Sequence, residues 1–400
     1  MIPRRVWVRA LGVRSPLGAT WPATCAALTE GRSAVAPVSR FDARGYPCTV
    51  AAAEPTAADG EEDRRLALAR AAAREAWSAA RAVAPPGRLG VFVGAESGRT
   101  SFATLVSLAR AAGGKATFDH GAFGVAARPV AARIQAPRMS PAAIASALAA
   151  DVGARGPVET ISLACASGSA AIVEAARAIR RGECDVALAG GTGADVDPLM
   201  FAAFGLLGAL SERGVSRPFD AHRDGFVLGE GAAMTVLSHD REGALAEVAG
   251  VGRSLDAYHL TAPDPEGDGA ARAMRAALTD AGTARVDYVQ AHGTSTPLND
   301  AVEARALRRV LGDALDDARV SSVKGALGHW IAGAGALGFV CAVEAVVNGT
   351  ILPTAGLRQP DTECALPHVI ESAIRRSVET ALVNAFGFGG ANVSIVVRRP

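Results

Sequence analysis

Short apolar runs alternate along the chain with longer, alanine-rich stretches. A short apolar run bounded by turn residues predicts a buried strand, and a longer stretch of helical periodicity predicts a helix. Alternation of the two is typical of an α/β fold, in which helices cover the faces of buried sheets. The expected strands are 89–94, 185–190, 287–290 and 392–397, and the expected helices are 63–81, 140–151, 168–181, 269–281, 300–311 and 333–348.

Two segments break this alternation. The polar segment 238–247 follows an apolar run near the middle of the chain, and it predicts a boundary between residues 1–240 and residues 241–400. The glycine-rich, polar segment 112–140 predicts a surface loop or flap. A chain of 400 residues is long enough for two domains or for one large duplicated unit.

The composition is that of a soluble globular protein. Half of the residues are hydrophobic and a fifth are charged, with 41 basic against 40 acidic residues. This balance gives no reason to expect nucleic acid or an anionic membrane as a partner. The N-terminus lacks the apolar core of a signal peptide, and no window of about 20 residues is uniformly apolar. We therefore expect a cytoplasmic protein without membrane insertion.

The six cysteines are scattered, and none forms the CxxC pair of a zinc site, so no metal is expected. Cys165 differs from the others because it lies where a strand-like run meets a helix-like stretch. A helix N-terminus beneath a thiol favours the thiolate, which is the nucleophilic form. The plainer alternative is a small, buried and inert cysteine.

Two histidines follow in separate motifs. His292 comes after a strand in Ala-His-Gly-Thr-Ser-Thr-Pro, where the hydroxyls of Thr294 and Thr296 can bond a polar chain. His329 ends the motif Ser-Ser-Val-Lys-Gly-Ala-Leu-Gly-His, which contains Lys324, and it precedes a helix rich in alanine and glycine. Two of these residues also have a plainer interpretation. His292 could be a histidine whose hydrogen bonds are satisfied within its own loop, and Lys324 could be a surface lysine.

The fourth motif is Asn-Ala-Phe-Gly-Phe-Gly-Gly-Ala-Asn, residues 384–392. Its glycines let the backbone approach another group closely, so one N–H here can join that of Cys165 in an oxyanion hole, unless the motif is only a tight turn. One cysteine and two histidines are suited to joining an acyl group to a malonyl group. The cysteine takes an acyl group from a thioester, and neutral imidazoles hold the enolate that forms when a malonyl group loses carbon dioxide.

The four motifs, in this order, resemble those of β-ketoacyl-acyl carrier protein synthases of the decarboxylating elongation type, which use Cys-His-His. Two further stretches agree with this resemblance, at 11–18 and 216–232, so that it covers the chain from about residue 5 to 398. The resemblance implies the thiolase fold, with two similar α/β halves in a five-layer αβαβα sandwich. It also implies a homodimer, or a heterodimer with a related subunit, and no cofactor beyond the phosphopantetheine arm of the carrier protein.

The resemblance also implies roles for individual residues. Cys165 would accept the acyl group, His292 and His329 would support decarboxylation, and Lys324 would order His329 within a charge network that includes Glu303. The remaining expected roles are contact with the phosphopantetheine arm by Thr294 and Thr296, an acyl gate and oxyanion hole at Phe388 and Gly389, the acyl pocket at Phe204, and docking of an acidic carrier protein by Arg64 and Arg65.

The chain departs from the family pattern at several positions. Gly338 stands where a Glu is usual after the second His, and Glu344 is a candidate replacement. Trp330 is bulkier than expected, and Gly193 stands where an acidic residue is common. These departures favour a specialised role, in polyketide or aryl polyene synthesis, over housekeeping fatty-acid synthesis.

Two other functions compete with an active condensing enzyme. One is a non-catalytic or heterodimer-dependent subunit that sets chain length, although such subunits usually lack the cysteine. The other is a thioester hydrolase or decarboxylase, if the change at Gly338 has disabled condensation.

Overall fold

The computed structural model describes residues 4–55, 63–113, 117–131 and 139–400. Its strands form a ten-stranded sheet in the order β10-β9-β13-β14-β8-β1-β7-β6-β4-β5. The strands are β1 (Trp7–Arg14), β4 (Leu89–Gly94), β5 (Val158–Ile161), β6 (Val186–Ala194), β7 (Glu230–Ser238), β8 (Ala246–Leu255), β9 (Tyr288–Gln290), β10 (Arg319–Ser321), β13 (Thr380–Gly387) and β14 (Ala391–Arg398).

The sheet divides into two halves with the same connectivity. β1 and β8 pair only through Trp7 with Glu247 and Val8 with Ala246, so five strands lie on each side of this junction. In the first half β4 lies between β5 and β6 in parallel, and β6, β7 and β1 continue antiparallel. The second half repeats this pattern with β9, β10, β13, β14 and β8.

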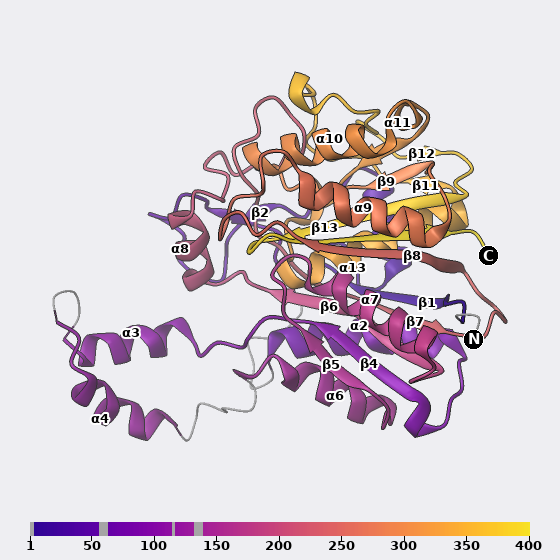
Figure 1. Cartoon of the computed structure of the whole chain (residues 1–400). Coiled ribbons are helices and arrows are strands. Elements are labelled where there is room, and N and C mark those ends of the chain that lie inside the picture. Colours follow the sequence, from indigo (N-terminus) through magenta and orange to yellow (C-terminus); the bar gives the residue numbers. More distant parts are fainter. Residues whose placement is uncertain (1–3, 56–62, 114–116, 132–138) are drawn as a thin grey trace.

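Six long helices complete the repeat and form three layers. α2 (Arg64–Ala80) and α6 (Ala142–Val152) cover the outer face of the first half, and α9 (Asp268–Ala281) and α10 (Pro297–Leu311) cover that of the second. Between the halves lie α7 (Ser167–Arg181) and α13 (Ala334–Asn348), in the largest hydrophobic cluster. The five layers are visible in Figure 1, and they confirm the predicted thiolase fold and the six predicted helices.

The division of the chain at residue 240 stays a prediction. β7 ends at Ser238 and β8 begins at Ala246, on either side of the polar segment. The halves share the core around α7 and α13, as well as the junction between β1 and β8.

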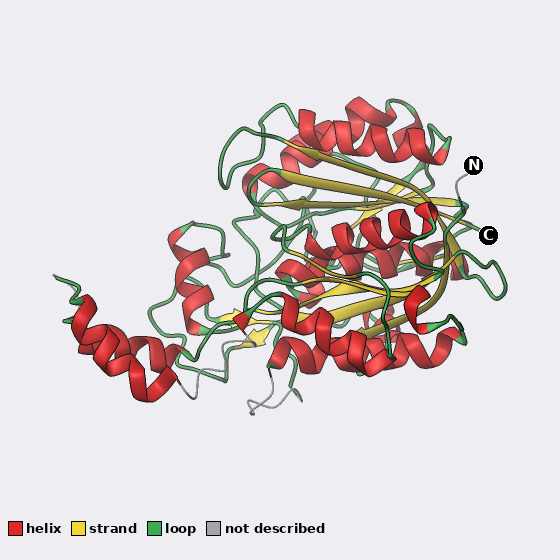
Figure 2. Ribbon diagram, turned by 60° about the horizontal axis from the view of Figure 1, so that its bottom comes forward, coloured by secondary structure: helices red, strands yellow, loops and turns green. Residues whose placement is uncertain are grey.

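The prediction of a loop at 112–140 is wrong for much of that segment. α4 (His120–Ala131) forms there, and the side chain of Asp119 accepts hydrogen bonds from the N–H groups of Gly121 and Ala122 at its start. With α3 (Phe102–Ala111) it makes an arm that projects from the body (Figures 1 and 2). Residues 114–116 and 132–138 lie outside the described residues.

The shorter elements serve as connections around the two halves. They are α1 (Trp21–Thr29), α8 (Pro198–Leu206), α11 (Ala314–Asp317), α12 (Lys324–Leu327), β2 (Ala36–Pro37), β3 (Val50–Ala51), β11 (Thr350–Ile351), β12 (Ile374–Arg375) and the 3-10 turns Pro86–Arg88, Ile331–Gly333 and Thr362–Cys364.

Among the residues that the structure describes, one helical stretch, Ile331–Asn348, is long and apolar enough to cross a membrane. It is 83% buried inside the protein, because α13 lies in the central layer between the two sheets. Its apolar character is therefore explained by its position in the hydrophobic core.

Candidate active site

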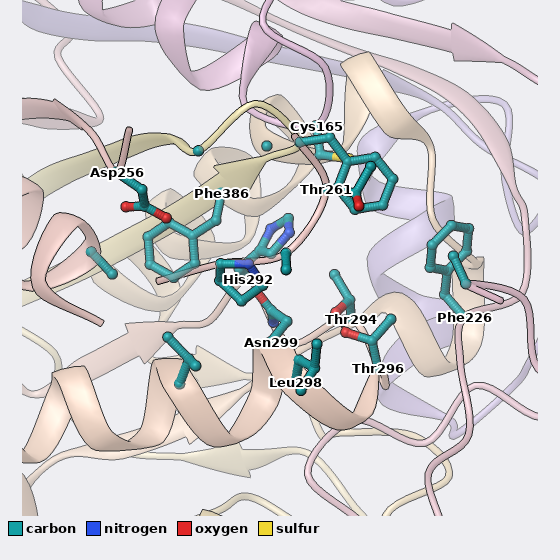
Figure 3. Close-up of a pocket in the computed structure, with 18 of the residues that line it drawn as sticks. Cys165, Phe226, Asp256, Thr261, His292, Thr294, Thr296, Leu298, Asn299 and Phe386 are labelled. Carbon is teal, nitrogen blue, oxygen red and sulfur yellow. Dashed lines mark hydrogen bonds between the residues drawn. The ribbon is translucent and has the colours of Figure 1, made fainter. Parts of the chain in front are cut away.

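Cys165 lies in a tight loop between β5 and α7. The preceding residue, Ala164, has a φ of +48°, a left-handed conformation that costs about 1–3 kcal/mol in a residue other than glycine. Ser167 holds this conformation, since its hydroxyl donates to the carbonyl of Ala164 at 2.6 Å and accepts the N–H of Leu163 at 2.8 Å. The loop thereby turns the thiol toward the cavity described below (Figure 3).

The expectation that the helix N-terminus keeps Cys165 as a thiolate is wrong for this state of the site. Burial raises the pKa of the Cys165 thiol to about 12, and the nearby charge of Lys324 offsets only part of that rise. Loss of hydration at this buried position therefore favours the neutral thiol over the thiolate.

His329 is fixed as one tautomer. Its Nδ1 accepts a hydrogen bond from the N–H of Ile331 at 3.1 Å, so the neutral ring carries its proton on Nε2. Ile331 has a φ of +47°, which is rare for a β-branched residue and indicates that its surroundings hold the turn. The backbone N–H of His329 donates to Val227 at 2.8 Å and its carbonyl accepts from Gly229 at 3.0 Å.

His292 has the same tautomer for a different reason. Its Nδ1 lies 3.5 Å from Nζ of Lys324, an ammonium donor, so Nε2 carries the ring proton. The N–H groups of His292 and Gly293 donate to the two carboxylate oxygens of Glu303, each at 2.8 Å. The ring centroids of His292 and His329 lie 5.7 Å apart, at an interplanar angle of 79°.

Both imidazoles are neutral. Burial lowers the pKa of His292 and of His329 well below its usual value of 6.5, and the positive charge of Lys324 lowers both further. Two neutral N–H donors in a desolvated site suit a developing oxyanion, because they need no reorganisation as the charge forms.

Lys324 and Glu303 are two buried ionisable groups behind the histidines, and they interact through their charges. Nζ of Lys324 donates to the carbonyl of His292, and its charge lowers the pKa of His329. The ordering of His329 by Lys324 stays a prediction. Burial lowers the pKa of Lys324, and the charge of Glu303 opposes this. Burial raises the pKa of Glu303, and hydrogen bonds from Gly293, His292 and Asn384 oppose that rise.

Glu344 does not replace a carboxylate at position 338. It accepts hydrogen bonds from Nε1 of Trp21 at 3.0 Å and from Asn348 at 2.9 Å, at the outer end of α13. A Cβ at Gly338 would instead meet Gln290 at 3.4 Å. The hydroxyl of Tyr288 donates to Gln290 at 2.6 Å, so the position faces a neutral, buried hydrogen-bonded pair.

A cavity of about 330 Å³ connects these groups to the surface. Cys165, His292 and His329 line it together with Thr294, Thr296 and Phe388, as Figure 3 shows for several of them. Leu207 and Leu298 also line it, and they are 52% and 61% exposed, which places them at its mouth.

Thr294 and Thr296 lie together along this cavity. Their hydroxyls are 2.9 Å apart in a mutual hydrogen bond. The N–H of Thr294 donates to Asp300 at 2.9 Å, which holds the loop against the start of α10. The two hydroxyls can therefore meet a polar chain that enters the cavity, as the motif predicts.

The glycine-rich motif packs directly against the cysteine loop. A Cβ at Gly387 would lie 2.5 Å from the carbonyl oxygen of Leu163 and 3.4 Å from the nitrogen of Cys165, so only glycine fits. Gly389 does not offer its N–H to the site, because that group donates to Leu260 at 2.7 Å. This removes Gly389 as an oxyanion donor.

Aromatic side chains fill the space beyond Cys165. The rings of Phe204 and Phe388 have centroids 6.3 Å apart, and those of Phe204 and Phe226 are 5.4 Å apart. Phe204 and Cys165 are buried in one hydrophobic cluster, against which Phe388 packs. Phe388 and Phe226 line the cavity, and Phe204 packs behind them. The role of Phe388 as a gate stays a prediction.

Arg64 and Arg65 do not form a docking surface, which corrects the sequence prediction. Arg65 is buried, with its guanidinium bonded to Asp63 and to the carbonyl of Glu96. Arg64 donates to the buried carboxylate of Glu230 at 2.8 Å. Both side chains are committed to internal ion pairs at the start of α2.

Three residues that matter to the site were missed. Asp300 accepts the N–H groups of Thr294 and Ser295, and its acidic side chain at the start of a helix was an available signal. Glu96 accepts a hydrogen bond from the hydroxyl of Ser162, next to the cysteine loop, and Ile331 fixes the His329 tautomer. Neither had a sequence signal, because one is a long-range contact and the other a backbone conformation.

Within the described ranges, no group of three or more His, Cys, Asp or Glu side chains is arranged to hold a metal ion. The expectation of a reaction without metal or cofactor stays a prediction.

Comparison with known proteins agrees with this geometry. The family model for the N-terminal domain of β-ketoacyl synthases matches residues 3–243, and that for the C-terminal domain matches residues 245–358. The solved structure described as the ishigamide ketosynthase/chain length factor superposes with a TM-score of 0.87, at 33% identity and over 100% of both chains. A second, a type II polyketide ketosynthase in complex with its acyl-carrier protein, gives 0.86 at 29% identity, also over 100% of both chains.

Curated relatives come from two branches of metabolism. A 3-oxoacyl-[acyl-carrier-protein] synthase 2 of Coxiella burnetii is 37% identical over 100% of this chain and 99% of its own length. The tetracenomycin polyketide synthase ketoacyl synthase alpha subunit of Streptomyces glaucescens is 35% identical over 99% of this chain and 97% of its own length. With the two family models, the duplicated fold and the Cys-His-His site, these relatives show that the chain belongs to the β-ketoacyl synthase family.

Proposed function

We propose that the protein catalyses a decarboxylating Claisen condensation, in which an acyl group on Cys165 is joined to malonyl-acyl carrier protein. The observation that carries this proposal is the meeting of one thiol and two neutral imidazole Nε2–H groups at one cavity. The products are β-ketoacyl-acyl carrier protein and carbon dioxide.

In the first half-reaction the sulfur of Cys165 attacks the acyl thioester. A new C–S bond forms, the carbon–sulfur bond to the carrier arm breaks, and the thiol proton ends on the departing pantetheine thiol. The tetrahedral oxyanion would be held by the N–H groups of Cys165 and Phe388, since Gly387 brings this backbone against the cysteine loop.

In the second half-reaction the malonyl group loses carbon dioxide. The electrons of the broken C–C bond move to the thioester carbonyl, and the Nε2–H groups of His292 and His329 hold the resulting enolate oxygen. The enolate carbon then attacks the acyl thioester on Cys165, and the C–S bond breaks to release the cysteine thiolate and the β-ketoacyl product. Loss of one such donor typically costs about 2.7–4 kcal/mol of transition-state stabilisation.

The substrate arm would enter past Leu207 and Leu298, and Thr294 and Thr296 would bond it inside. The carrier protein would then sit over this mouth, because the arm spans from there to Cys165. We place the acyl chain beyond Phe388, toward Phe204. The reaction as written needs no metal or other cofactor, and we place the enzyme in the cytoplasm, in a dimer.

A second candidate is a subunit that depends on a related chain. It is favoured by the similarity to a structure described as a ketosynthase/chain length factor. The acyl chain could belong to fatty-acid, polyketide or aryl polyene synthesis, since relatives from fatty-acid and polyketide enzymes match about equally well.

Intact-protein mass spectrometry tests the proposal. The wild type and Cys165→Ala are incubated with a panel of acyl-carrier proteins, and malonyl-carrier protein is added second. A mass gain on the wild type alone, then lost with release of carbon dioxide and a β-ketoacyl product, is the expected result. Acylation that persists in Cys165→Ala would overturn the assignment of the nucleophile. A wild type that stays unmodified with every donor would point to the subunit that requires a partner.

A further inference from the structure

Trp330 directly follows His329. Among the fully buried side chains in the described part of the chain, it has the largest volume. The indole Nε1–H donates to the carbonyl of Leu327 at 2.9 Å. The backbone carbonyl of Trp330 accepts the N–H of Gly333 at 3.0 Å. Both ends of the residue are therefore anchored within the core.

Three glycines from two other parts of the chain pack closely against Trp330. A Cβ at Gly231 would lie 2.5 Å from the indole ring, and one at Gly229 would lie 2.9 Å from it. A Cβ at Gly193 would lie 1.8 Å from the carbonyl oxygen of Trp330. Backbone carbonyls exclude a side chain at Gly193 and at Gly229, where the oxygen of Leu327 would lie 2.2 Å from the added Cβ. At Gly231 the obstacle is the indole itself, so this glycine is matched to the tryptophan.

In the sequence, Trp330 lies between His329 and Ile331, the two residues joined by the hydrogen bond that fixes the His329 tautomer. The N–H that fixes the His329 tautomer belongs to Ile331, which is held at a φ of +47°. The peptide that carries this N–H begins at Trp330. Because a strained turn persists only when its surroundings hold it, the packed indole is well placed to hold this one.

We propose that Trp330 is a positioning residue for His329. Its buried indole fixes the peptide that joins it to Ile331, which keeps the proton of His329 on Nε2 and directed into the cavity. The inference rests on the proposed function, since it assigns Trp330 to the decarboxylation half-reaction and leaves acylation of Cys165 to other residues.

Substitution of Trp330 should separate the two half-reactions. In Trp330→Leu, carbon dioxide release from malonyl-carrier protein should fall by about 10- to 100-fold, the loss expected when a catalytic group is displaced by about 1 Å. Acylation of Cys165 should stay near the wild-type rate, and Trp330→Phe should lie in between. Trp21→Leu is the matched control, because Trp21 is also buried and donates its Nε1–H, to Glu344 at 3.0 Å, away from the site.

Two further measurements keep the inference testable if Trp330→Leu folds poorly. Nitrogen-15 NMR of the imidazoles should show His329 with its proton on Nε2 in the wild type and a mixture of tautomers in the variant. Gly231→Ala, which pushes on the indole from the other side, should lower decarboxylation, and the double variant Gly231→Ala with Trp330→Leu should recover part of that loss.

The inference is overturned if Trp330→Leu keeps the wild-type rate of decarboxylation. It is equally overturned if both half-reactions fall in the same proportion as in Trp21→Leu, or if the His329 tautomer is unchanged. Failure of the proposed function looks different, because the wild type itself would then neither acylate Cys165 nor release carbon dioxide.

Discussion

His292 and His329 face one cavity from separate motifs, with ring centroids 5.7 Å apart and ring planes at 79°. The Nδ1 of each ring is taken by a donor from the protein, Lys324 for one and the N–H of Ile331 for the other. An oxygen atom between the rings can therefore accept two N–H bonds, while both rings stay neutral. This relationship leads to the first prediction.

His292→Ala and His329→Ala should each lower decarboxylation of malonyl-carrier protein by about 10²- to 10³-fold, because each removes one donor to the enolate. Acylation of Cys165 should change far less, and the two rates are compared by product analysis and mass spectrometry. His368→Ala is the control, since that histidine is largely buried away from the cavity. Equal loss of both half-reactions would contradict the assigned roles.

Lys324 and Glu303 should depend on one another. Lys324→Met or Glu303→Gln alone leaves one buried charge uncompensated, and each should lower the free energy of unfolding by about 3–5 kcal/mol. The double variant should be more stable than the sum of the two losses predicts. Urea unfolding measures this, and strictly additive losses would show that the two charges act independently.

Stability should fall on acidification because of the buried histidines. The pKa of His329 is well below 6.5 in the folded protein, so below pH 6.5 the unfolded chain gains a proton that the native state lacks. The loss is about 1.4 kcal/mol per pH unit for such a group. Glu303 acts with the opposite sign, because its raised pKa makes the native state hold a proton that the unfolded chain has lost.

The difference between wild type and His329→Asn isolates this contribution. Urea unfolding from pH 5 to 7 should show a smaller pH dependence in the variant, with Glu303 unchanged in both. Identical slopes would mean that His329 is protonated in the native state.

The exposed leucines at the cavity mouth should affect only protein-borne substrates. Leu207→Ser and Leu298→Ser should raise the KM for acyl-carrier protein and leave the KM for a free pantetheine thioester unchanged. Val83→Ser is the matched control, because Val83 is 93% exposed and lies outside the residues that line this cavity. An equal rise for both substrates would place the leucines in the cavity itself, and a change in oligomeric state would assign them to a subunit contact.

Arg65 should matter to stability and not to docking. Arg65→Ala leaves Asp63 and the carbonyl of Glu96 without a buried partner, so the free energy of unfolding should fall by about 3 kcal/mol. Arg44→Ala removes a solvent-exposed ion pair with Asp42 and should leave stability nearly unchanged, because water screens such a pair. A weakened carrier-protein affinity in Arg65→Ala, at unchanged stability, would restore the docking role.

The sequence by itself determined the six long helices, the α/β class and the candidate residues of the site. These follow from local periodicity and from short motifs such as those of Cys165 and His292, which need no distant partner to be recognised. The helix α4 was missed because the glycines and Pro129 within it are typical of loops.

Only the tertiary structure decided how these groups behave. Burial makes Cys165 a thiol, keeps both histidines neutral and turns Arg65 inward, and burial depends on segments far away in the chain. The fit of Trp330 against Gly193 and Gly231 is of the same kind. Desolvation and close packing are properties of the assembled core, so no single segment of the sequence contains them.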